Sequence, residues 1–129
     1  MPVFLEAIET PNQDDHRDLT KVFNDAPQWL QSYNDVDQWL ASIAASEELQ
    51  LFAGRFNDRL ITAAVVRKEE GKWHLEWLTV RTVTRDRCVG QRMVSEISRV
   101  AAENNCTLSA KPIDNAETLP SYLRALMGL

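Results

Sequence analysis

The stretch that decides the fold runs from Leu75 to Val100 and reads LEWLTVRTVTRDRCVGQRMVSEISRV. Its first part, Leu75–Val80, alternates and carries β-branched side chains, which predicts a strand. Apolar residues at three- and four-residue spacing then predict an amphipathic helix; they are Met93, Val94, Ile97, Val100 and Ala101. The turn between the two is basic and closes on Gly90. A strand that enters a helix through such a turn directs backbone N–H groups at one spot, which predicts a phosphate-binding site.

Size and charge narrow the class of protein. The chain has 129 residues, and we expect residues 1–129 to form a single domain with one core. A net charge of −5 argues against general nucleic-acid binding. No apolar run reaches membrane-spanning length and no signal-peptide pattern opens the chain, so we expect a cytoplasmic protein without a membrane partner.

Against this acidic background a local cluster of arginines stands out, formed by Arg81, Arg85, Arg87 and Arg92. A solvated helix entrance would give the same pattern. Two cysteines, Cys88 and Cys106, flank the predicted helix, which spans roughly 21 Å if it has about fourteen residues. That span is too long for a disulfide, so we predict free thiols. Cys88 would be activated at a helix N-terminus, but no base lies near it in sequence, which favours an unreactive thiol. No group of residues has metal-ligand spacing.

The remaining patterns complete an α/β element order. Strands are predicted at residues 3–8, 49–56, 60–67, 73–80 and 107–110, with Asn57-Asp58 as a tight hairpin turn. One helix begins after Thr10-Pro11-Asn12, and a second begins at Asp35 as N-cap. A last helix begins at Asp114 or Asn115. The order strand, helix, helix, three strands, helix, strand, helix predicts a mixed sheet with helices on both faces.

This order and the loop Arg85-Asp86-Arg87-Cys88-Val89-Gly90 resemble the GNAT family of N-acetyltransferases, in which a loop of the form Gln/Arg-x-x-Gly-x-Gly/Ala holds the pyrophosphate of acetyl-CoA. Within GNAT the sequence is most similar to the PanM/PanZ group. These small acetyl-CoA-binding proteins trigger maturation of aspartate 1-decarboxylase, in pantothenate biosynthesis, and damp its activity. The segments that carry the resemblance are Arg55–Leu60, Leu78–Arg81, Val83–Arg85 and Val89–Gln91.

The resemblance implies acetyl-CoA as the cofactor and a set of contacts to it. Backbone groups of Leu78 and Val80 would pair with the pantetheine amides like an added strand. Backbone N–H groups of Arg87, Cys88, Val89, Gly90 and Gln91 would bind the pyrophosphate, helped by the charges of Arg85 and Arg87. Asn115 matches a frequent contact to the pantetheine arm.

Four features depart from the family pattern. Cys88 replaces the first glycine of the loop, and Asp86 places a carboxylate beside it. The segment Asn24–Glu48 is longer than in small PanM-like proteins and includes a second helix. The surface that would bind the decarboxylase would therefore differ from theirs. GNAT sheets normally end with two strands after the last helix, whereas this chain ends at Gly128-Leu129. We therefore expect a sheet without those strands, whose last short strand is open to a second copy of the chain.

Acetyl transfer would need a base and an acid. Glu76 falls where many GNAT enzymes keep a catalytic glutamate, and His74 would face the same side of the strand and relay the proton. The simpler interpretation is a half-exposed carboxylate beside a surface histidine. Tyr122, the candidate acid, is turned roughly 200° from the direction that the family's tyrosine takes.

These observations favour an acetyl-CoA-binding regulator that binds a protein partner, such as the aspartate 1-decarboxylase proenzyme. The alternative is a GNAT acetyltransferase that uses Glu76 as its base and acts on an unknown amine. A third, weaker hypothesis is a GNAT domain that binds neither acetyl-CoA nor the decarboxylase.

Overall fold

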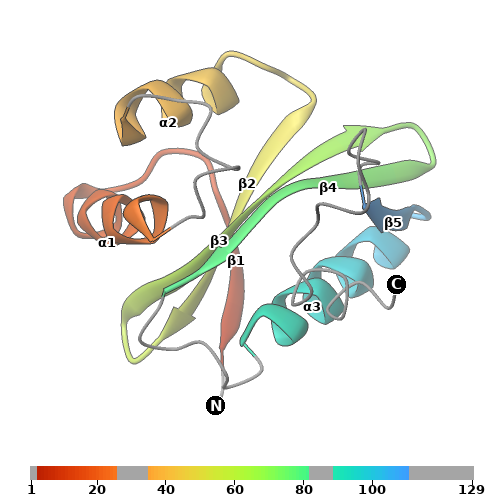
Figure 1. The fold of residues 1–129 in the computed structure, drawn as a ribbon. Helices are drawn as coiled ribbons and strands as arrows, with labels where there is room; N and C mark the ends of the chain where they lie inside the picture. Colours follow the sequence, from red (N-terminus) through yellow and green to blue (C-terminus); the bar gives the residue numbers. More distant parts are fainter. Residues whose placement is uncertain (1–2, 26–34, 82–88, 111–129) are drawn as a thin grey trace, which may run out of the picture.

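The computed structural model describes residues 3–25, 35–81 and 89–110, which form one five-stranded sheet of order β1-β2-β3-β4-β5. The strands are β1 (Phe4–Ile8), β2 (Leu49–Phe56), β3 (Arg59–Glu69), β4 (Lys72–Val80) and β5 (Thr107–Ala110). The helices are α1 (Gln13–Asn24), α2 (Val36–Ala44) and α3 (Val89–Glu103). Figure 1 shows α1 and α2 on one face of the sheet and α3 on the other. The predicted last helix lies outside the described residues.

Strand pairing confirms the mixed α/β sheet. Neighbours from β1 to β4 pair antiparallel, whereas β4 and β5 pair parallel. The β2–β3 hairpin turns at Asn57 and Asp58, whose φ angles of 49° and 64° are both left-handed. Such angles are what a two-residue hairpin loop requires, and Asn and Asp tolerate them better than most residues. The predicted turn is therefore confirmed.

Both predicted helix starts are confirmed by side-chain caps. Asn12 Oδ1 accepts a hydrogen bond from the Asp15 N–H at 2.8 Å at the start of α1. Asp35 Oδ1 accepts one from the Gln38 N–H at 2.8 Å at the start of α2. Each cap satisfies one of the N–H groups that the first turn of a helix leaves without an acceptor.

The sheet separates two layers of hydrophobic core. On the α1/α2 face, Trp39 packs against Trp77 of β4 with ring centroids 4.6 Å apart. On the α3 face, Met93 and Ile97 pack against a cluster that includes Leu78. Residues 60–66 of β3 are buried throughout, as predicted for a central strand that contacts both layers.

Gly54 of β2 allows α3 to lie close to the sheet. A Cβ atom at this position would lie 2.5 Å from Thr62 Cγ2, 2.7 Å from Val3 Cγ1 and 3.0 Å from Met93 Sδ. These separations are well below van der Waals contact, so any side chain here would have to push its neighbours apart. The missing side chain thus sets the distance at which α3 packs.

We predict that Gly54→Ala lowers the free energy of unfolding by about 1–3 kcal/mol, because it overpacks the core beneath α3. Urea unfolding of the purified chain measures the change. Thr62→Ser removes the nearest methyl group and keeps the hydroxyl, which donates to the Thr79 carbonyl oxygen at 2.8 Å. The Gly54→Ala penalty should therefore shrink in the Thr62→Ser background. An equal penalty in both backgrounds would contradict the steric explanation.

Candidate functional site

The end of β4 directs part of its backbone away from the sheet. The Arg81 N–H donates to the Ile61 carbonyl oxygen at 2.8 Å, and Thr62 pairs with Val80 in register. Because this hydrogen bond joins their neighbours Ile61 and Arg81, Thr62 and Val80 themselves form a non-hydrogen-bonded pair of the antiparallel ladder. Such pairs alternate along the ladder with hydrogen-bonded ones. Leu78 and Val80 therefore point their N–H and C=O groups away from β3. On that side, within the described part of the chain, β5 pairs with Lys72–Leu75.

The N-terminus of α3 lies beside this end of β4. Val80 and Val89, the first residue of α3, are buried in one cluster with Val3 and Ile61. The N–H groups of the first helical turn have no acceptor within the helix, and the helix dipole makes this end positive. The strand end and the helix start together fit an elongated ligand that has amide groups at one end and phosphate at the other.

Two buried polar atoms flank Leu78. Trp77 Nε1 and Thr79 Oγ1 are buried and have no hydrogen-bond partner among residues 3–25, 35–81 and 89–110. A buried polar group left unsatisfied costs about 1–3 kcal/mol, so such groups are rare and often mark a functional region.

Several predicted contacts fall on residues that the structure does not describe: Arg85, Arg87, Cys88 and Asn115. The sequence placed Val89 and Gly90 in the turn before the helix, whereas the structure begins α3 at Val89, so the backbone of Val89, Gly90 and Gln91 lies in its first turn. Their contact with a pyrophosphate stays a prediction. Two arginines of the predicted cluster have acidic neighbours: Arg81 Nε donates to Asp25 Oδ2 at 2.9 Å, and Arg92 Nη2 lies 3.6 Å from Glu96 Oε1. Part of the positive charge that the cluster suggested is therefore balanced locally.

Glu76 and His74 have separate ion-pair partners. Glu76 Oε1 accepts a hydrogen bond from Arg67 Nε at 2.7 Å, and Arg67 Nη1 donates to Glu48 Oε2 at 2.8 Å. His74 Nε2 lies 3.3 Å from Glu69 Oε2. Their roles as base and relay stay predictions. The sequence analysis did not identify Arg67 as the partner of Glu76. The turn after Glu69 could have indicated it, because this turn places Arg67 opposite His74 and hence diagonal to Glu76.

The hairpin segment Arg55–Leu60 is fastened to α1 and β1 by its arginines. Arg55 Nη2 donates to both carboxylate oxygens of Asp15 at 3.1 Å, and its Nε donates to Glu6. Arg55 Nη1 donates to the Asp58 carbonyl oxygen at 3.1 Å, which ties the turn to the same guanidinium. Residues 55–60, which carry part of the resemblance, thus have a structural role, because they join the hairpin to the first helix.

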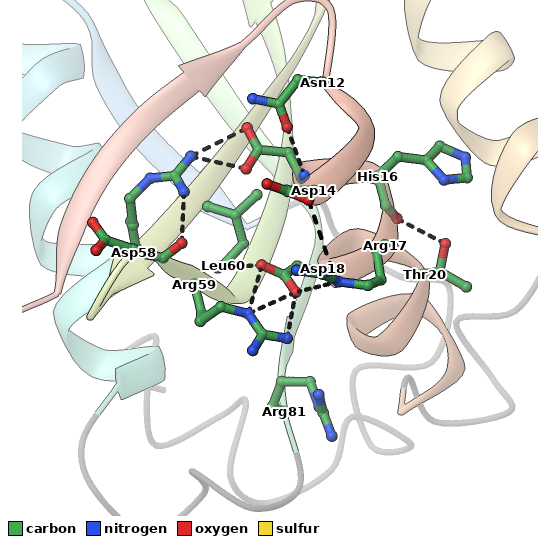
Figure 2. Close-up of polar contacts among 12 residues, drawn as sticks. Asn12, Asp14, His16, Arg17, Asp18, Thr20, Asp58, Arg59, Leu60 and Arg81 are labelled. Atoms are coloured by element: carbon green, nitrogen blue, oxygen red, sulfur yellow. Dashed lines mark hydrogen bonds and ion pairs between the residues drawn. The ribbon is translucent and has the colours of Figure 1, made fainter.

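Asp18 forms the second link between α1 and the hairpin, as Figure 2 shows. Arg59 Nη2 donates to Asp18 Oδ1 at 2.8 Å, and the Leu60 N–H donates to Asp18 Oδ2 at 3.1 Å. Burial alone would raise the pKa of Asp18, but the hydrogen bonds from Arg59 and Leu60, with the charges of Arg59 and Arg17, together hold that pKa below its usual 3.8.

Comparison with known proteins places this arrangement in a family. A family profile described as "Acetyltransferase (GNAT) domain, PanZ" matches residues 2–127. The chain belongs to the PanZ family of GNAT domains. Its five-stranded α/β fold is accordingly a GNAT fold, as the sequence predicted.

Curated relatives carry a regulatory name. The chain is 28% identical over 127 residues to the PanD regulatory factor of Escherichia coli K12, a match that covers 98% of this chain and 91% of that protein. It is 39% identical over 99 residues to the PanD regulatory factor of Salmonella typhimurium LT2, covering 77% and 68% of the two chains.

A solved structure supplies a cofactor-bound relative. The solution NMR structure of E. coli YhhK bound to coenzyme A matches with a TM-score of 0.61 and 25% identity. The match covers 98% of this PanZ-family chain and 90% of YhhK.

Among its own described helices, this chain has none long and apolar enough to cross a membrane.

We predict that Asp18→Asn destabilises the protein by about 1–3 kcal/mol at neutral pH, because it weakens charge-assisted hydrogen bonds to a buried group. The pKa of Asp18 is lowered in the folded state, so its contribution is complete above the usual value and is lost as the pH falls through the folded value. The variant resembles the protonated acid.

The difference in unfolding free energy between wild type and Asp18→Asn should therefore be constant from about pH 5 to 7 and shrink below about pH 4. Urea unfolding at each pH measures it. Asp37→Asn, at an exposed side chain of α2, serves as the control with a small effect. A wild-type advantage that persists unchanged at pH 3 would contradict the assignment.

Proposed function

We propose that this PanZ-family chain is an acetyl-CoA-binding regulatory protein that binds a protein partner, the aspartate 1-decarboxylase proenzyme. The observation that carries the proposal is the backbone at the end of β4, where Leu78 and Val80 direct amide groups away from β3 beside the N-terminus of α3. The names of the curated relatives support the choice of partner.

The geometry suits the two chemically different parts of acetyl-CoA. The pantetheine arm contains two amides, which would pair with an outward strand edge as an added strand does. The pyrophosphate would lie at the positive end of α3, near the N–H groups of Val89, Gly90 and Gln91. Arg85, Arg87 and Asn115 would add the contacts expected from the resemblance. The coenzyme A bound to YhhK supports this choice of ligand.

We infer a non-catalytic role because the best candidate base is already engaged. The Glu76 carboxylate accepts a hydrogen bond from Arg67, so one oxygen faces a cation rather than an amine. We also infer a cytoplasmic location, where aspartate decarboxylase would be met. Among the described residues β5 is an edge strand, and we infer that its outer edge would allow the chain to pair with a second copy.

The decisive experiment combines the purified chain, acetyl-CoA and the decarboxylase proenzyme. We expect calorimetric titration to show acetyl-CoA binding, and we expect proenzyme cleavage to be faster with chain and acetyl-CoA together than with either alone. Absence of binding by a folded sample would reject the proposal. Binding without faster cleavage would reject the decarboxylase as partner.

The acetyltransferase alternative is tested in the same samples. Release of coenzyme A is measured across a panel of amines with wild type and Glu76→Gln. We expect no amine-dependent release above the rate without protein. Release by wild type that Glu76→Gln abolishes would instead favour acetyl transfer with Glu76 as the base.

A further inference from the structure

We propose that Arg67 and Glu76 are positioning residues: their ion pair stabilises the β-bulge in β4, beyond which Leu78 and Val80 direct their backbone N–H and C=O groups away from β3. The inference rests on the proposed function for the identity of the ligand. It assigns Glu76 a role in shaping the binding edge rather than in proton transfer, and it assigns a role to Arg67.

The bulge is defined by a change of register. Val66 pairs with Leu75, whereas Val65 pairs with Trp77, so Glu76 is an extra residue in β4 without an opposite residue in β3. A single inserted residue of this kind bends a strand and changes which of its groups point toward the neighbour. Here the change occurs just before the segment that would bind the cofactor.

Removal of the bulge would reverse the direction of every group beyond it. With the register of Val66 and Leu75 continued, Leu78 would pair with Ala63 rather than with its present partner Ala64. Leu78 and Val80 would then occupy hydrogen-bonded positions and direct their N–H and C=O groups at β3. Trp77 and Leu78 would also exchange faces, away from Trp39 and from α3 respectively.

Arg67 is placed to prevent this slip. Its guanidinium lies between two carboxylates, with Nε bonded to Glu76 on β4 and Nη1 bonded to Glu48, which precedes β2. The Glu76 side chain is only 16% exposed and that of Arg67 is 32% exposed, so solvent screens this pair less than a surface ion pair. One arginine therefore connects β3, β4 and the residue that precedes β2, close to the point where the register changes.

The two consecutive residues at the bulge, Glu76 and Trp77, are held on the same face of the sheet by different contacts. Trp77 is locked on the α1/α2 face by its packing against Trp39, at 4.6 Å. The adjacent residue, Glu76, accepts a hydrogen bond from Arg67. Arg67 lies two residues from Val65 in β3 and therefore on the same α1/α2 face, so Glu76 is held on that face too. Two consecutive residues on one face are the signature of a bulge. Packing fixes one of them, and the ion pair fixes the other.

A double-mutant cycle tests the proposal with Arg67→Met, Glu76→Gln and the double variant. Two quantities are measured: the dissociation constant for coenzyme A by calorimetry, and backbone amide exchange of residues 76–80 by NMR without ligand. We expect each single variant to weaken coenzyme A binding roughly tenfold and the double variant to be no weaker than either. Exchange at Trp77 and Thr79, whose N–H groups bond β3, should accelerate.

Two further variants make the outcome decisive. Arg99→Met removes an arginine that bonds Glu96 and Glu103 on the exposed side of α3 and should change neither quantity. Arg67→Lys keeps the charge without the guanidinium fork and should give an intermediate effect, which covers the case that Arg67→Met does not fold. Wild-type affinity and wild-type exchange in folded Arg67 and Glu76 variants would overturn the proposal.

Failure of the proposed function is distinguishable from failure of this inference. If wild type binds no coenzyme A, the proposed function fails, but the exchange pattern still reports on the bulge. A role for Glu76 as base predicts that Glu76→Gln binds coenzyme A normally and leaves amide exchange unchanged, and this result too would overturn the positioning role.

Discussion

The pairing of β3 with β4 changes register once, at Glu76. Both the hydrophobic layers and the direction of the Leu78 and Val80 backbone groups, which are proposed to bind the cofactor, depend on that change. Below it, Trp73 and Leu75 pack on the α3 face. Above it, Trp77 packs on the α1/α2 face and Leu78 packs under α3. Since side chains alternate along a strand, no unbulged β4 could make both sets of contacts.

The local parts of the fold were predictable because their causes lie within a few residues. Asn12 and Asp35 cap their helices through the third residue along, and Asn57-Asp58 supplies the left-handed angles of a tight turn. The burial of β3 followed from its uninterrupted apolar run. These signals are local steric and hydrogen-bonding preferences, which a sequence displays directly.

The candidate site was predictable in outline but not in its supporting contacts. The pattern from Leu75 to Val100 indicated a strand end beside a helix start, and the N–H and C=O groups of Leu78 and Val80 do point away from β3 there. Arg67 was missed because the alternation of β4 looks continuous through Glu76 in the sequence. A bulge depends on which backbone groups pair between two strands, and residue types alone do not specify that pairing.

The antiparallel pairing of β1 with β2 has a consequence for how the chain folds. Strands β2, β3 and β4 are joined by tight turns, whereas β1 reaches β2 only across both α1 and α2. Closing a long loop costs more entropy than closing a short one, so we expect the meander to form before β1 and α1 dock. The Arg55–Asp15 contact would then form after the transition state. Asp15→Asn should accordingly speed unfolding more than it slows refolding in stopped-flow measurements.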